Sequence, residues 1–122
     1  MTQTVIELSF TIAPMRNKKD LENKIIQAKN KKAKAIAHYN LGLFHDNNGR
    51  EKEAIPNYLK ALKFGLEKKI KSQALAWLAS SLYKTGKPKE ALKRIKESKK
   101  IGDKKLQQFL MGLEKRIWKT IK

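Results

Sequence analysis

The sequence predicts an all-α protein in which pairs of helices stack on one another, preceded by a short arm with a strand-like pattern. Three observations support this prediction. Two stretches of the chain follow one residue template at a constant offset of 37 residues, apolar residues recur at helical spacing from residue 17 onwards, and glycines close several of these stretches. An internal repeat of this length is typical of proteins that stack one structural unit and present a surface for binding.

The repeat is defined by six positions. In each copy a small residue follows a leucine, a turn glycine comes seven residues later, and small, large and small residues then follow at spacings of four and three. The first copy holds Leu41, Gly42, Gly49, Ala54, Tyr58 and Ala61, and the second holds Leu78, Ala79, Gly86, Ala91, Ile95 and Ser98.

Composition limits the organisation of the chain. Its 122 residues suffice for one helical domain, which we place at residues 15–122. The absence of cysteine excludes disulfides, thiolate metal sites and a cysteine nucleophile. No apolar run approaches the roughly 20 residues of a membrane-spanning helix, and the first residues lack the features of a signal peptide. We therefore expect a cytoplasmic protein, and we do not expect a membrane partner.

The net charge of +18 is spread along the whole chain, and most of the 29 basic residues are lysines. Specific recognition of bases or phosphates usually recruits arginine, because its planar group binds bidentately. A lysine-rich surface is therefore consistent with simple solvation, and equally with a binding footprint for nucleic acid or for an acidic protein.

The first element in order is the arm, residues 1–14. Ile6, Leu8, Phe10 and Ile12 alternate with other residues, a period of two that favours a strand, and Pro14 ends the segment. A lone strand leaves its backbone groups unpaired. The arm must therefore pair with a second chain, cover the helices with its apolar side, or stay disordered.

Six helices are predicted after the arm. Gly49, Gly65 and Gly86 act as helix stops, Pro88 suits a first helical turn, and Asp103 suits an N-cap. We expect Pro56 to bend the third helix without breaking it. The predicted helices span about residues 17–30, 32–47, 50–64, 69–84, 88–100 and 104–121.

The last helix carries one apolar stripe, as expected of a helix that caps a stack. The stripe comprises Leu106, Phe109, Leu110, Leu113, Ile117 and Ile121. Met111 and Trp118 lie together outside it. Three interpretations stay open for this pair: a secondary strip that contacts a partner, an anchor at a membrane surface, or the edge of the core.

The repeat resembles the tetratricopeptide repeat. The resemblance is carried by Tyr39-Asn-Leu-Gly, Asn48-Gly49, Glu53-Ala54-Ile55, Tyr58 and Lys60-Ala61-Leu62, and more loosely by Trp77-Leu-Ala, Thr85-Gly86, Glu90-Ala91-Leu92 and Ile95. Within that family the chain is similar to a bacterial subfamily of unassigned function with an Ile-Pro-x-Tyr helix and a Gly-Leu connection. The resemblance implies a right-handed α-α superhelix with repeats at 35–68 and 72–105, a preceding half-repeat and a capping helix at 104–121.

The resemblance also implies a concave groove lined by the first helix of each unit. The corresponding positions are Tyr39, Asn40, Leu43, Asp46, Asn47, Gln73, Ala76, Trp77, Ser80, Tyr83 and Lys84. Aromatic residues at such positions often dominate binding, although Trp77 and Tyr39 could instead pack beneath neighbouring helices. The basic clamp of the members that bind chaperone tails is absent, so we do not predict that ligand.

No residues point to catalysis. His38 and His45, the only histidines, occupy packing positions about 10 Å apart along one helix, too far apart to share a metal ion easily. No nucleophile is paired with a base, and no glycine-rich phosphate loop is present. We predict a protein that is not an enzyme and has no cofactor or metal.

Three functional hypotheses follow. The first is an adaptor for protein–protein interaction whose groove binds a peptide or helix, with an acidic partner expected. The second is a protein associated with RNA or the ribosome that binds phosphates through its lysines. The third is a structural homodimer joined through residues 4–13.

Overall fold

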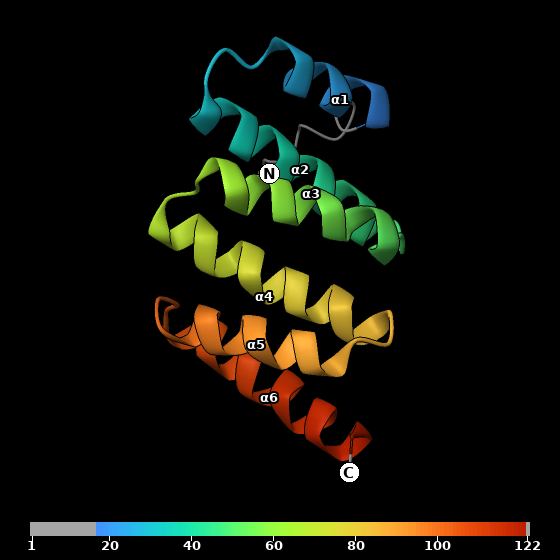
Figure 1. Ribbon diagram of the computed structural model, residues 1–122, viewed down its shortest axis with the longest axis vertical. Coiled ribbons are helices and arrows are strands. Elements are labelled where there is room, and N and C mark those ends of the chain that lie inside the picture. Colours follow the sequence, from blue (N-terminus) through green and yellow to red (C-terminus); the bar gives the residue numbers. More distant parts are fainter. Residues whose placement is uncertain (1–16, 122) are drawn as a thin grey trace, which may run out of the picture.

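The computed structural model describes residues 17–121, which contain six α-helices and no strand. The helices follow one another along a single stack with short connections (Figure 1). The predicted all-α solenoid is therefore confirmed. The helices are α1 (Lys18–Gln27), α2 (Lys31–Asn47), α3 (Glu51–Phe64), α4 (Lys68–Lys84), α5 (Pro88–Lys99) and α6 (Lys104–Thr120).

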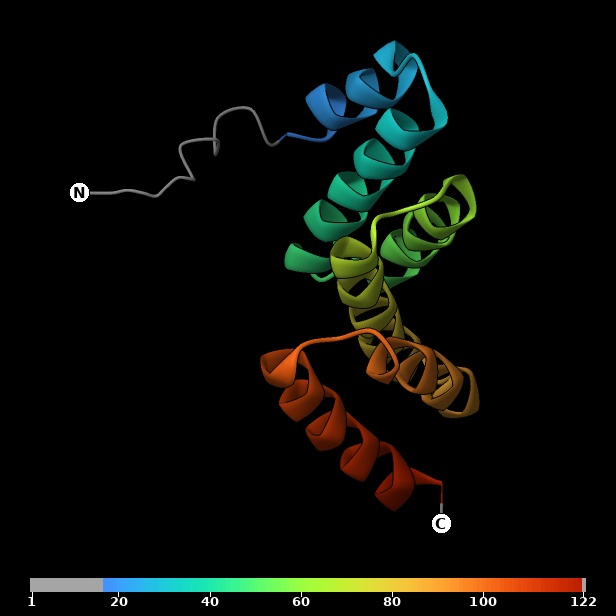
Figure 2. The same ribbon diagram turned by 90° about the vertical axis from the view of Figure 1, so that its left-hand side faces the viewer.

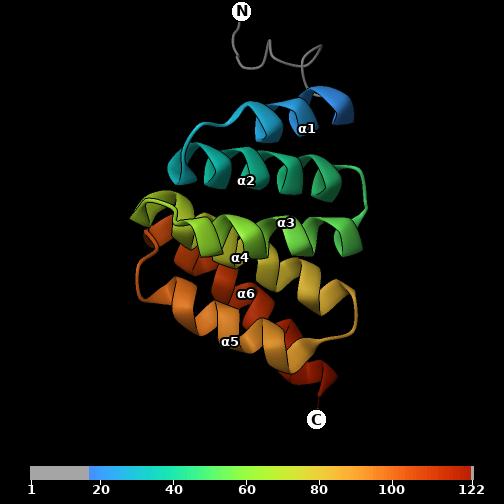
Figure 3. The same ribbon diagram turned by 45° about the horizontal axis from the view of Figure 1, so that its top comes forward.

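The helices form two sides of the stack. Helices α2, α4 and α6 line one side, and α3 and α5 lie on the other (Figure 2). Helix α1 packs on α2 at one end, and the connecting loops lie at the two edges of the stack (Figure 3). The pairs α2–α3 and α4–α5 are thus the two copies of the repeat. Each pair begins a few residues before the repeat boundary expected from the sequence, at Lys31 and Lys68.

Local residue chemistry accounts for the helix ends. Gly49 and Gly86, at equivalent positions of the two copies, have φ angles of 72° and 84°, which a residue with a Cβ atom rarely adopts. The side chains of Asn17, Asn30 and Asp103 cap α1, α2 and α6 by accepting hydrogen bonds from backbone N–H groups at 2.8 to 2.9 Å. Each copy of the repeat therefore turns at the same place for the same reason.

Pro56 lies within α3, which continues unbroken from Glu51 to Phe64. Its side chain is exposed. The expectation that this proline does not break the helix is confirmed.

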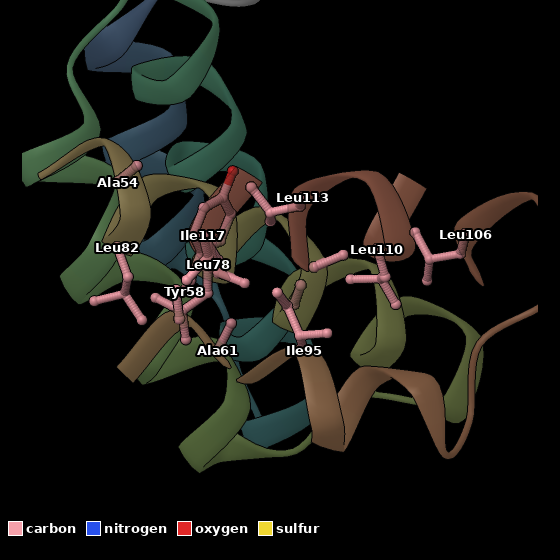
Figure 4. Packing of buried hydrophobic residues seen from close by; sticks show 14 of the residues in the cluster. Ala54, Tyr58, Ala61, Leu78, Leu82, Ile95, Leu106, Leu110, Leu113 and Ile117 are labelled. Carbon is pink, nitrogen blue, oxygen red and sulfur yellow. The ribbon is translucent and has the colours of Figure 1, made fainter. Parts of the chain in front are cut away.

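The core runs between the two sides of the stack (Figure 4). The small, large and small positions of the template are all fully buried, and they are Ala54, Tyr58 and Ala61 on α3 and Ala91, Ile95 and Ser98 on α5. A Cβ atom added to Gly42 would lie 2.7 Å from two ring carbons of Tyr58. The template therefore encodes the close crossing of the two helices within a pair.

Helix α6 packs on α5 and α4 through the predicted stripe. Leu106, Leu110, Leu113 and Ile117 are buried. Phe109 and Ile121, at the margins of the stripe, are half-buried. No helix within residues 17–121 is long and apolar enough to cross a membrane.

The predicted strand-like arm, residues 1–14, lies outside the described residues. The homodimer expected through residues 4–13 therefore stays a prediction.

Candidate partner-binding groove

The expected groove residues belong to α2 and α4. These two helices and α6 line one side of the stack (Figure 2). The exposure of the expected groove residues differs. Asn47 and Lys84 are exposed, Tyr39 is buried, and the others are half-buried: Asn40, Leu43, Gln73, Trp77, Ser80 and Tyr83. For most of these residues, only part of the side chain is therefore accessible to a partner.

A cleft of about 570 Å³ opens on this side between the N-terminal halves of α4 and α6. Trp77, Leu106 and Phe109 supply large apolar side chains to its wall. The other lining residues are Lys68, Lys69, Ser72, Gln73, Ile101, Gly102, Asp103 and Lys105. The cleft is thus apolar in its interior and basic at its rim.

The ring of Trp77 is held from two directions. Its Nε1–H donates a hydrogen bond of 3.2 Å to the hydroxyl of Tyr39, and that hydroxyl donates one of 3.1 Å to Oε1 of Gln73. The ring also meets Phe109 of α6 edge-on, with the ring centroids 5.1 Å apart. Burial raises the pKa of Tyr39, against a smaller lowering by the hydrogen bond from Trp77. Tyr39 therefore stays a neutral phenol and fixes the orientation of Trp77.

Positive charge surrounds the cleft. Lys68, Lys69 and Lys105 are exposed, and each lies in the first turn of α4 or α6. Neither first turn holds an acidic residue, although acidic residues are favoured there by the helix dipole. Asp103 is the only carboxylate of the lining, and it accepts the capping hydrogen bond from the Leu106 N–H at 2.9 Å.

Some residues expected in the groove form contacts between helices or are buried. Asp46 accepts a hydrogen bond of 2.8 Å from the buried Tyr58 hydroxyl and one of 3.2 Å from Ser81 Oγ, so it joins α2, α3 and α4. Its carboxylate raises the pKa of Tyr58, in addition to the larger effect of burial. Ala76 is fully buried. The sequence-based assignment of Ala76 to the groove is therefore wrong, and the carboxylate of the half-buried Asp46 is engaged within the fold.

At the other end of α4, the hydroxyls of Tyr83 and Thr120 lie 3.2 Å apart and link α4 to the end of α6. Helices α4 and α6 are therefore in contact at two places, through Tyr83 and Thr120 and through Trp77 and Phe109. No hydrogen bond or ion pair within residues 17–121 was found for the side chains of Asn40, Asn47 and Lys84.

Sequence reasoning missed Phe109 and the basic rim of Lys68, Lys69 and Lys105 as groove residues. Phe109 was assigned to the stripe that packs on the stack. A signal for the rim was present, because Lys31-Lys32, Lys68-Lys69 and Lys104-Lys105 begin α2, α4 and α6 in the same way.

The two histidines are packing residues. His38 shares a 3.0 Å hydrogen bond with Asn57 Oδ1 and stacks on Phe64. His45 Nδ1 accepts a 3.1 Å hydrogen bond from Arg50 Nε. Burial lowers the pKa of His45, and the Arg50 charge lowers it further. Within residues 17–121 no group of three or more potential ligands could hold a metal ion.

The predicted secondary strip is solvent-accessible. The side chains of Met111 and Trp118 are 50% and 55% exposed, two turns apart on α6. They are therefore not part of the core.

Comparison with known proteins supports the resemblance drawn from the sequence. A family model described as "Tetratrico peptide repeat" matches residues 35–116. No curated protein and no solved structure gave a match. Tetratricopeptide repeat families are generally non-enzymatic scaffolds for protein–protein interaction. The matched region runs from within α2 to within α6 and covers over half of the chain, so the protein belongs to the tetratricopeptide repeat family.

Proposed function

We propose that the protein is a non-enzymatic adaptor and that the cleft between α4 and α6 binds an acidic peptide or helix of a partner protein. The observation that carries this proposal is the combination of an apolar wall, formed by Trp77, Leu106 and Phe109, with a rim of three lysines. A partner would insert one large apolar side chain into the cleft and place carboxylates beside Lys68, Lys69 and Lys105.

The fixed orientation of Trp77 supports a role in recognition. Its hydrogen bond to Tyr39 and its contact with Phe109 restrict the ring before any ligand arrives. A side chain that is already ordered loses little conformational entropy on binding, and preorganised aromatic anchors are typical of binding hot spots.

The lysine rim would act mainly on association. Charge complementarity steers an acidic partner toward the cleft and raises the association rate, and added salt screens this effect. Binding of RNA phosphates by the lysines is the competing function, and it too predicts a strong dependence on salt. Salt dependence alone therefore does not distinguish binding of an acidic protein from binding of RNA. A dependence of binding on Trp77 does distinguish them.

The test is affinity purification from native lysate with tagged wild-type protein, Trp77→Ala and Trp118→Ala, each with and without nuclease. We expect an acidic protein that is retained after nuclease treatment, lost with Trp77→Ala and kept with Trp118→Ala, the matched tryptophan control. Loss of all partners on nuclease treatment would instead support the RNA-binding function and overturn the adaptor proposal.

A charge reversal provides the second arm. Lys68→Glu, Lys69→Glu and Lys105→Glu combined should abolish capture of that protein. The matched control, Lys52→Glu, Lys60→Glu and Lys93→Glu, changes the net charge equally on exposed sites of α3 and α5 and should retain it. Circular dichroism of each variant establishes that the helices are intact.

A further inference from the structure

Helices α2, α4 and α6 are equivalent elements of successive units. Each is 17 residues long, and each lies on the same side of the stack (Figure 2). Aligned from their first residues, the three helices can be compared position by position. Positions 3, 7, 10 and 14 of α6 are Leu106, Leu110, Leu113 and Ile117, the residues buried against the preceding helices.

The opposite face, at positions 5, 8, 12 and 15, distinguishes α6 from the other two. In α2 and α4 every residue of this face is buried: Ala35, His38, Gly42 and His45 in α2, and Ser72, Leu75, Ala79 and Leu82 in α4. In α6 all four residues are exposed, and we call them the α6 end face: Gln108, Met111, Lys115 and Trp118.

In the first two units a second helix covers this face. Position 8 of α2, His38, contacts Asn57 and Phe64 of α3, and position 12, Gly42, lies against the ring of Tyr58. In the second unit, Ser98 Oγ of α5 donates a 2.8 Å hydrogen bond to the backbone oxygen of Ser72. No helix within residues 17–121 covers the α6 end face in the same way.

The residue at position 12 indicates what a covering helix must carry. Gly42 and Ala79 are small there, so a large side chain such as Tyr58 fits opposite. In α6 the same position is Lys115, whose length and charge exclude an apolar side chain at that point. A carboxylate opposite Lys115 would pair with it, while Met111 and Trp118 would still contact apolar side chains on either side.

We propose that the α6 end face binds an acidic amphipathic helix of a partner protein, with a carboxylate against Lys115 and apolar side chains against Met111 and Trp118. Gly112, beside Met111, has open space around its Cα atom and permits a close approach of the second backbone. This surface is distinct from the α4–α6 cleft and does not depend on the function proposed for it.

Charge argues against a second copy of the chain as the occupant. Two α6 end faces related by a two-fold axis would bring lysine toward lysine, on two chains of net charge +18 each. Lys104 and Lys119 add to the positive charge around the face, and Glu114, the nearest carboxylate along α6, is paired with Lys99 of α5 at 3.3 Å. An acidic helix would instead place carboxylates beside these lysines, so that the contact is attractive.

The probe is a synthetic, chemically stapled helix with the sequence of α3, Glu51–Phe64, which covers the equivalent face of α2. Both versions carry Lys52→Glu and Lys60→Glu, which make the helix acidic. One version also carries Tyr58→Glu and the other Tyr58→Lys. By fluorescence polarisation, the wild-type protein should bind the Tyr58→Glu peptide with a Kd of about 100 μM or tighter. It should bind the Tyr58→Lys peptide at least about tenfold more weakly.

Protein variants complete the test. Lys115→Glu should reverse the preference between the two peptides. Trp118→Ala should weaken the binding of the Tyr58→Glu peptide about tenfold. The controls Lys63→Glu and Leu59→Ala, at exposed sites of α3, should change neither affinity. Failure of the wild-type protein to bind the Tyr58→Glu peptide, or a preference that Lys115→Glu leaves unchanged, would overturn the proposal. So would a homodimer in light scattering that Trp118→Ala converts to a monomer.

Discussion

The crossing of α2 and α3 makes a sharp prediction about Gly42. The Cβ of an alanine at this position would lie 2.7 Å from Cδ1 and Cε1 of Tyr58, closer than such atoms approach in folded proteins. The ring cannot move aside easily, because Tyr58 is fully buried and its hydroxyl donates a hydrogen bond to Asp46. Gly42→Ala must therefore displace packed atoms.

The magnitude follows from two opposing effects. Overpacking of a close-packed core costs about 1–3 kcal/mol, while replacing a glycine inside a helix with alanine gains about 0.5–1 kcal/mol. Gly112 offers a matched control, because it also lies inside a helix and a Cβ there would meet nothing within 4 Å. Gly112→Ala should therefore stabilise the protein, and the difference between the two variants isolates the overpacking cost.

The assay is urea unfolding followed by circular dichroism. With a denaturant dependence of about 2 kcal/mol/M, a difference of 2 kcal/mol corresponds to about 1 M between the two midpoints. A second arm repeats Gly42→Ala in a Tyr58→Ile background, which reproduces the Ala79 and Ile95 pair of the second unit. There the penalty should disappear. Equal stability of Gly42→Ala and Gly112→Ala, or a penalty that survives Tyr58→Ile, would refute the packing argument.

Three further outcomes follow from the described contacts. Tyr39→Phe leaves the Trp77 N–H without its acceptor, and it should lower the free energy of unfolding by about 1–2 kcal/mol in urea titration. His45 has a lowered pKa in the folded state, so its contribution to stability is present above the unfolded-state pKa of about 6.5 and is lost as pH falls. Thermal melts at pH 7.5 and 5.5 should therefore differ less for His45→Gln than for wild type, and an unchanged difference would contradict the role of Arg50 and burial. Gly86→Ala, with a φ angle of 84°, should cost about 1–2 kcal/mol in the same titration from backbone strain alone.

The helices and their ends were predictable because their causes are local. Gly49 and Gly86 end helices through their own backbone conformation, and Asp103 begins α6 through a hydrogen bond three residues away. The 37-residue template then predicted the pairing, because small residues at fixed spacings permit only a close crossing of two helices. These signals need no knowledge of the rest of the molecule.

The candidate groove was only partly predictable, because its residues meet across helices that are distant in sequence. Phe109 lies at the margin of the α6 stripe, and the tilt of α6 against α4 decides whether it faces the core or the cleft. Asp46 occupies a groove position in the repeat, yet its carboxylate is used by Tyr58 and Ser81. Neither outcome follows from periodicity alone.

The pair Met111 and Trp118 shows a similar limit. The sequence left three interpretations open, and the side chains of Met111 and Trp118 are 50% and 55% exposed. The alignment of α6 with α2 and α4 adds what the sequence alone did not show, namely that this pair lies on the face covered by a second helix in the other units.

Recognition of an acidic protein by a preorganised tryptophan in a basic cleft can be measured by calorimetry. The protein captured by wild type from native lysate is isolated, and its affinity for wild type and for Trp77→Ala is measured by calorimetry in the presence of nuclease. We expect retained binding to wild type and a loss of affinity of at least about tenfold with Trp77→Ala. Equal affinity for the two proteins, or binding that vanishes with nuclease, would contradict it.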